Sequence, residues 1–183
     1  MSEELLIRHC SPTLAGIKTA NMFSYCFNSK SEMQDVIRKL NRVLSKKGLR
    51  VIPLSTKDGR TLIYVFRPNK LMCDLRDNTA CNLLQDIGYS PCNVPGCINH
   101  LIKRLNEGEG FPHEIGLFLG YPPLDVKGFI ENKEGTCKCV GTWKVYSDEE
   151  KAIKTFERYK KCTDVYSRLY ADGKPIEKLA VAV

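Results

Sequence analysis

Two pairs of adjacent residues in this sequence carry side chains that can take part in chemistry. His9 is followed by Cys10, and His113 is followed by Glu114. An imidazole titrates near neutral pH and a carboxylate can orient it, so the second pair is a candidate general acid–base pair. A cysteine thiolate is a candidate nucleophile. The candidate catalytic residues are therefore Cys10, His113 and Glu114.

The residues after Cys10 predict that a helix begins there. Ser11 is a favoured N-cap residue and Pro12 is favoured at the first helical position, so a helix is expected from there to about Cys26. A helix N-terminus lowers the pKa of a nearby thiol and so raises its thiolate fraction. The alternative interpretation is that Cys10 is a small buried apolar residue beside a hydrogen-bonded histidine.

A strand, a loop and a helix are predicted after His113. The apolar run 115–119 is typical of a buried strand, and the segment Gly120-Tyr121-Pro122-Pro123 leads into a helix of roughly ten residues. Ligands often bind at such a junction in α/β proteins. The prolines remove backbone donors and Asp125 adds a carboxylate, so a rigid turn is favoured over a phosphate-binding loop. The alternative for His113 and Glu114 is that they satisfy backbone groups at the start of the strand.

The nine cysteines indicate a reducing compartment. Their number is odd and the chain is long enough to fold without disulfides, so free thiols in the cytoplasm are expected. The N-terminus starts acidic, unlike a secretory signal, and no stretch approaches the roughly 20 apolar residues of a membrane-spanning helix. A metal site made from Cys92, Cys97 and His100 would have irregular spacing. Neither a metal ligand set nor a cofactor is therefore assigned.

The remaining patterns predict alternating helices and strands. A capping box at Ser31 begins a helix that stops at Gly48, and a hairpin with an Asp58-Gly59 turn follows it, with Pro53 on an edge strand. Helical pieces are expected over 68–110, with breaks near Asn78, at 88–91 and at Gly108. A strand over 136–146 is expected to pair in parallel with 115–119. A long helix capped by Asp148 follows and ends at Gly173, and the tail over 176–183 is a strand or a loose end.

These elements predict an α/β protein, with α+β as the alternative. We expect a single domain over residues 1–183, with one small mixed sheet of about four to five strands that includes the hairpin, flanked by six or more helices. The formal net charge of +7 favours acidic partners, but no RNA-binding signature accompanies the basic residues.

Three segments together resemble a known family. They are HCSPTLAGIK from His9, HEIGLFLGYPPLDVKGFI from His113, and GTWKVY from Gly141. They are similar to a bacterial family, frequent in anaerobes, that is catalogued as a domain of unknown function. The resemblance implies a stand-alone bacterial protein of the cytoplasm, and it brings no activity, cofactor or catalytic residue with it.

Three functions are consistent with these patterns. The first is binding of a small ligand, cofactor or metal between the His9–Cys10 helix start and the His113–Glu114 and Gly120–Pro123 segment. Its candidate ligand-binding residues are His9, Cys10, Lys18, His113, Glu114 and Tyr121. The alternatives are a thiol- or histidine-dependent enzyme, and a non-catalytic module that docks an acidic partner through the basic face of helix 148–170. The first two require the His9–Cys10 and His113–Glu114 pairs to meet in space.

Overall fold

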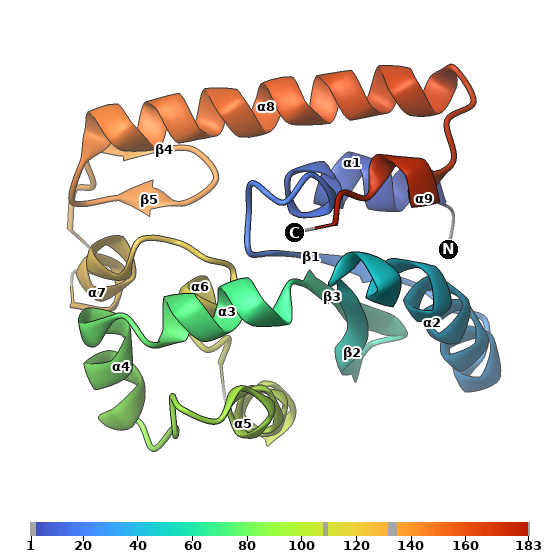
Figure 1. The fold of residues 1–183 in the computed structure, drawn as a ribbon. Coiled ribbons are helices and arrows are strands. Elements are labelled where there is room, and N and C mark those ends of the chain that lie inside the picture. Colours follow the sequence, from blue (N-terminus) through green and yellow to red (C-terminus); the bar gives the residue numbers. More distant parts are fainter. Residues whose placement is uncertain (1–2, 108–109, 132–134, 183) are drawn as a thin grey trace. The chain divides into compact units, whose positions relative to one another are not determined.

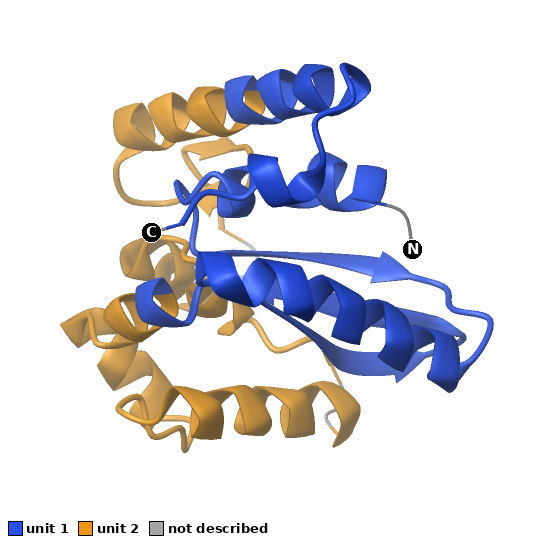
Figure 2. Ribbon diagram, turned by 45° about the vertical axis from the view of Figure 1, so that its right-hand side comes forward, with its two compact units in different colours: residues 1–70, 161–183 blue, residues 71–160 orange. Residues whose placement is uncertain are grey.

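The computed structural model describes residues 3–107, 110–131 and 135–182. The chain divides into two compact units: residues 1–70 with 161–183 form unit 1, and residues 71–160 form unit 2 (Figure 2). Two helices, α3 (Pro68–Leu75) and α8 (Glu149–Ala171), contribute residues to both units. The expectation of a single domain over the whole chain stays a prediction.

Unit 1 is a three-stranded antiparallel sheet with helices packed against one face. Its strands have the order β1-β3-β2. The elements are α1 (Glu3–Leu14), β1 (Ala20–Tyr25), α2 (Lys30–Leu44), η1 (Ser45–Lys47), β2 (Arg50–Lys57), β3 (Arg60–Phe66) and α9 (Ile176–Leu179) (Figure 1). The register pairs Phe23 with Ile63 and Val51 with Val65, so these four side chains share a face. That face forms one core with the apolar sides of α1, α2 and α9.

The hairpin predicted from the sequence is confirmed. Asp58 and Gly59 both have positive φ angles, of 49° and 73°, which the tight turn between β2 and β3 requires. Pro53 lies on β2, an edge strand of the sheet, and the pairing register shifts between Pro53 and Ser55; edge strands and bulges are where sheets tolerate proline.

Helix α2 is also found where the sequence predicts it, although its cap lies two residues earlier than expected. The Ser29 hydroxyl accepts from the Glu32 N–H at 3.1 Å, and the Glu32 carboxylate accepts from the Asn28 N–H at 2.8 Å. Ser29, not Ser31, is therefore the N-cap, and Glu32 reaches back one residue further than in a standard capping box, to the N–H of Asn28. The chain turns away at Gly48, whose φ of 73° ends the following 3₁₀ turn.

The predicted helix from Ser11 to Cys26 is wrong. Helix α1 ends at Leu14, and residues 20–25 form the strand β1. The Ser11 hydroxyl does not cap a helix, because it donates to the Ile7 carbonyl one turn earlier in the same helix. Buried Arg67 donates to the carbonyls of Thr13 and Leu14 at 2.8 Å each, so it caps the C-terminal end of α1.

Unit 2 is mainly helical. Its elements are most of α3, then α4 (Asn78–Gln85), α5 (Val94–Glu107), α6 (Ile115–Phe118), α7 (Pro123–Glu131), the strands β4 (Cys139–Val140) and β5 (Lys144–Val145), and the first half of α8 (Figure 1). The predicted breaks near Asn78 and at 88–91 are confirmed, and the break at Gly108 lies outside the described residues. Asp148 caps α8 as expected, since its carboxylate accepts from the Lys151 N–H at 3.0 Å.

The strand predicted over 115–119 is wrong, and so is its parallel pairing with a strand over 136–146. Residues 115–118 form the short helix α6, and β4 and β5 pair with each other in an antiparallel hairpin. A run of five apolar residues does not distinguish a strand from a buried helical turn. The tail also differs, because residues 176–179 form a helix.

The predicted α/β class is confirmed. Within the described residues, the five strands form two antiparallel sheets instead of one mixed sheet, and the helices outnumber the strands. None of the helices found in residues 3–107, 110–131 and 135–182 is long and apolar enough to cross a membrane.

Candidate functional site

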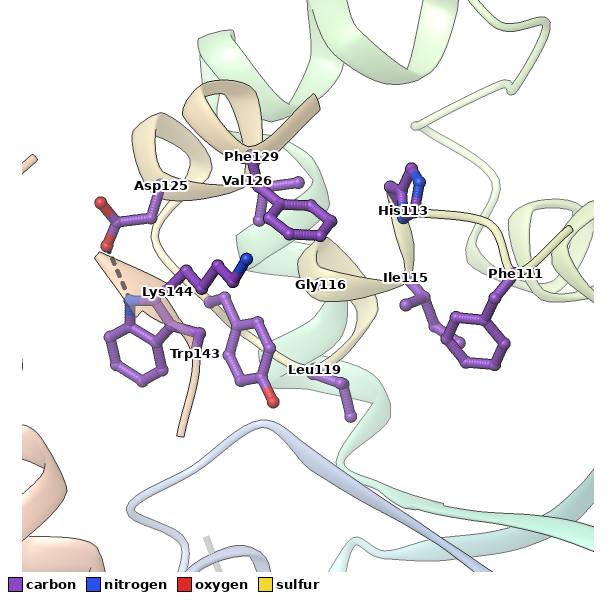
Figure 3. A pocket seen from close by; sticks show the side chains of 11 residues that line it. Phe111, His113, Ile115, Gly116, Leu119, Asp125, Val126, Phe129, Trp143 and Lys144 are labelled. Atoms are coloured by element: carbon purple, nitrogen blue, oxygen red, sulfur yellow. Dashed lines mark hydrogen bonds between the residues drawn. The ribbon is translucent and has the colours of Figure 1, made fainter. Parts of the chain in front are cut away.

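A cavity of about 420 Å³ lies within unit 2 (Figure 3). It is formed by the segment before α6, by α6 and α7, and by the β4–β5 hairpin. Its lining is mostly apolar and comprises Phe111, His113, Ile115, Gly116, Leu119, Tyr121, Asp125, Val126, Phe129, Trp143 and Lys144. A largely apolar cavity with a few polar groups is the usual form of a small-molecule site.

Asp125 fastens the hairpin to helix α7. Its buried carboxylate accepts from the Trp143 indole N–H at 2.7 Å and from the backbone N–H of Tyr146 at 2.8 Å. The backbone N–H and the hydroxyl of Ser147 donate to the same carboxylate, at 2.7 and 2.8 Å. Both carboxylate oxygens are thus engaged by the protein, and Figure 3 shows the side chain directed at the indole. Asp125 shapes the wall of the cavity.

Two glycines allow the close packing that forms the cavity wall. A Cβ atom at Gly116 would lie 2.8 Å from Val126 Cγ2, and one at Gly128 would lie 2.7 Å from the Cβ of Tyr146. Real Cβ contacts are not this short, so a larger residue at either position would push α6 or the end of the hairpin away from α7.

Aromatic rings and two basic side chains line the cavity. The His113 ring meets the Phe129 ring edge-on at a centroid distance of 5.0 Å. The Lys144 ammonium lies 5.5 Å from the centroid of the same Phe129 ring, within cation–π range. Trp143 packs between Tyr121, at 5.0 Å, and Phe156, at 4.6 Å. Burial, with a smaller contribution from Tyr159, raises the pKa of Tyr121 to about 12, so its hydroxyl stays protonated at neutral pH.

Glu114, a predicted site residue, is engaged by other side chains of the protein and does not line the cavity. Its buried carboxylate lies 2.6 Å from Arg104 Nε, in an ion pair that lacks hydrogen-bond alignment, and it accepts from the Tyr89 hydroxyl at 2.9 Å. Burial, and then the charge of Glu114, raise the pKa of Tyr89. Glu114 therefore faces Arg104 and Tyr89, whereas His113 faces Phe129. Whether the two residues act as an acid–base pair stays a prediction.

The other predicted residues lie in unit 1. Cys10 is inside helix α1 and fully buried in the core, so no helix N-terminus activates it; burial raises the pKa of its thiol, and Lys18 opposes this only in part. Lys18 is buried as well, and burial lowers its pKa to about 8. His9 is solvent-exposed but stacks its ring on Phe23 at 5.2 Å. The partial desolvation of the ring, and then the charge of Arg8, lower its pKa.

The structure thus brings together two of the predicted residues, His113 and Tyr121, which line one cavity. Whether His9, Cys10 and Lys18 meet them stays a prediction, because those residues belong to the other unit. Sequence reasoning did not select Phe129, Trp143 or Lys144, although all three lie in the segments that carry the family resemblance. No set of three or more His, Cys, Asp or Glu residues in the described part of the chain is arranged to hold a metal ion.

Fold and cavity together define a mixed α/β protein whose helical unit contains a small, largely apolar cavity. The chain belongs to the family described as "Protein of unknown function (DUF3793)", whose model matches residues 6–180. This confirms the resemblance to a family of unknown function. No curated protein and no solved structure matches the chain.

Proposed function

We propose that this protein binds a small organic molecule in the cavity of unit 2. The observation that carries this proposal is the cavity of about 420 Å³, whose aromatic and aliphatic lining includes the polar groups of His113, Tyr121 and Lys144. Its volume falls toward the lower end of the roughly 300–1,000 Å³ that is typical of small-molecule sites.

The surroundings of the candidate catalytic residues support binding over catalysis. The Glu114 carboxylate is engaged by Arg104 and Tyr89, so His113 has no carboxylate from its neighbour to orient it. The Cys10 thiol is buried in a hydrophobic core, where the thiolate is disfavoured. An enzyme that depends on either pair would need groups beyond these.

The interaction module with a basic docking helix is supported less well. Exposed basic residues on α8 alternate with acidic ones, and Lys154 pairs with Glu150 one turn away. Such a mixed face attracts an acidic partner only weakly. We also propose that the protein works in the reducing cytoplasm of a bacterium. The number of its cysteines and the family resemblance support this location.

The test is a fragment screen by ligand-observed NMR with the full chain. Leu119 lines the cavity, whereas Leu124 is 58% exposed and does not. Leu119→Phe should fill part of the cavity and weaken the fragments at least tenfold, and the matched control Leu124→Phe should bind them like the wild type. Binding that is indifferent to Leu119→Phe, or the absence of any bound fragment, would overturn the proposal.

A further inference from the structure

Hydrogen-bond donors predominate among the cavity groups that can bind a ligand's polar atoms. Asp125 is the acidic residue of the lining, and four donors from the hairpin region already engage its oxygens. Lys144 carries a full positive charge and three N–H donors. A neutral His113 ring offers one N–H donor and one acceptor nitrogen, and a protonated ring offers two donors. A ligand with an acceptor group, above all an anionic one, suits this set best.

The Lys144 side chain is part of the cavity lining. It projects over the Phe129 ring, at 5.5 Å from the centroid, and in Figure 3 the side chain extends toward Phe129 and Gly116. Among the residues that the structure describes, no carboxylate lies within ion-pairing distance of it. The Lys144 side chain is largely exposed, so an anion here would form a charge-assisted bond at moderate desolvation cost.

The rest of the lining suits a flat apolar body. Phe111, Phe129 and Trp143 present aromatic surfaces, and Leu119 and Val126 add aliphatic surface. Aromatic rings pack well in edge-on or offset contacts with other rings. A cavity near the small end of the usual range accommodates one or two fused rings rather than an extended cofactor.

From these observations we infer the ligand class: a small aromatic carboxylate, with its ring among Phe111, Phe129 and Trp143 and its carboxylate at Lys144. This inference rests on the proposed function, since it names the chemical class of molecule that the same cavity takes. A positively charged amine of equal size would be repelled by Lys144, and a neutral amide would lose the ionic contribution.

Three probes of nearly equal size test the inference: indole-3-acetate, neutral indole-3-acetamide and cationic tryptamine. We expect the wild-type protein to bind indole-3-acetate about tenfold more tightly than the amide, and to bind tryptamine most weakly. This tenfold corresponds to ~1.4 kcal/mol, just below the range of about 1.5–3 kcal/mol for hydrogen bonds to charged groups, as expected for an exposed lysine. Dissociation constants can be measured by NMR titration at low and high salt, because screening should reduce the preference.

Variants of Lys144 decide whether this side chain is responsible. The Lys144→Met variant should bind indole-3-acetate and indole-3-acetamide equally, whereas Lys144→Arg should retain the preference for the acid. Lys151 is exposed and lies outside the cavity lining, so the control Lys151→Met should behave as the wild type. Equal binding of the acid and the amide by the wild type would overturn the inference and leave the proposed function intact. The inference would also be overturned, and the proposed function kept, if fragments bind in a way that depends on Leu119 but none of the three probes binds. No binding by any molecule would overturn both.

Discussion

At the scale of single residues, Asp125 holds the site together although it is not itself a binding group. Three segments depend on one buried carboxylate: helix α7, the hairpin through Trp143, and the turn into α8 through Ser147. An isolated carboxylate this deep in the protein would be costly, and the four donors offset that cost. The cavity keeps its shape because its wall is tied by charge-assisted hydrogen bonds.

Asp125→Asn should therefore destabilise the protein far more than its small change in shape suggests. The amide has one acceptor oxygen and an NH₂ group that faces a donor, so at least one buried N–H loses its partner. We expect the free energy of unfolding to fall by about 2–4 kcal/mol, since unpaired buried groups and bonds to charged groups each contribute ~1–3 kcal/mol. Urea unfolding followed by Trp143 fluorescence measures this change.

The matched control is Asp148→Asn at the exposed N-cap of α8. Asparagine caps helices about as well as aspartate, so this variant should lose less than about 0.5 kcal/mol. Equal effects of the two substitutions would mean that the Asp125 carboxylate is not specifically required.

Lys18 leads to a prediction about pH. Burial lowers its pKa from 10.5 to about 8, so between these values the unfolded chain binds more protons than the folded one. The contribution of Lys18 to the free energy of unfolding must then rise with pH between about 8 and 10.5, and stay constant below pH 8. Lys18→Met removes the group, and the free energy of unfolding of the wild type minus that of the variant should increase by about 3 kcal/mol from pH 7 to pH 10.5, at ~1.4 kcal/mol per unit. The thiols and tyrosines are present in both proteins, so their contributions cancel in the difference. A difference in the free energy of unfolding that does not change with pH would contradict the lowered pKa of Lys18.

How much of the site could be predicted differs from residue to residue. His113 and Tyr121 were found because their types and their place beside a Gly-Pro-rich turn are visible in the sequence. For Asp125 the sequence indicates only a carboxylate unfavourable to phosphate, since its partners at 143, 146 and 147 are distant in sequence. Lys144 has no local pattern that separates it from any other surface lysine.

At the scale of elements, the sequence predicts best the structures that are determined locally. The β2–β3 hairpin and α2 follow from a turn with positive φ angles and from a capping box. Helices α1 and α6 were missed because tertiary contacts define their ends. Arg67, more than fifty residues away, caps α1, and α6 is a single turn that α7 covers at Gly116.

Gly141 is an element-scale constraint in the hairpin turn. A Cβ atom there would lie 2.3 Å from the Phe156 ring of α8, so Gly141→Ala must displace the turn that carries Trp143. Overpacking of this kind costs about 1–3 kcal/mol, and we expect a loss of that size in urea unfolding together with weaker ligand binding.

Two further variants test the cause. Gly110→Ala has open space around it and should be neutral within about 0.5 kcal/mol. Phe156→Leu should relieve the clash, so the double variant with Gly141→Ala should be more stable than the sum of the single effects predicts. Additive effects would show that the contact with Phe156 is not the source of the loss.

At the scale of the whole molecule, the division into two units could not be read from the sequence. The boundaries lie near positions 70 and 160, inside helices α3 and α8, and no Gly-, Pro- or Ser-rich linker marks them. The first unit is also discontinuous, since residues 161–183 return to it after unit 2 is complete. Composition and periodicity along the chain do not detect a return of this kind.

The shared helix α8 predicts that the two units unfold together. Its first half packs Ala152 and Phe156 within unit 2, and its second half packs Tyr166 and Leu169 within unit 1. Helix formation is cooperative and its nucleus is costly, so loss of packing on one half weakens the other half. Wild-type unfolding by urea should therefore show one midpoint, whether it is followed by Trp143 fluorescence in unit 2 or by far-UV circular dichroism of both units.

Breaking α8 at the boundary should separate the two transitions. Lys161 is exposed in the interior of the helix, and Lys161→Pro removes a backbone N–H and clashes with the preceding turn, at a cost of about 3 kcal/mol. We expect the fluorescence and circular dichroism midpoints of this variant to differ, while those of Lys161→Ala coincide. Two midpoints already present in the wild type would contradict coupling through the helix, and coincident midpoints in Lys161→Pro would mean that the coupling does not depend on helical continuity.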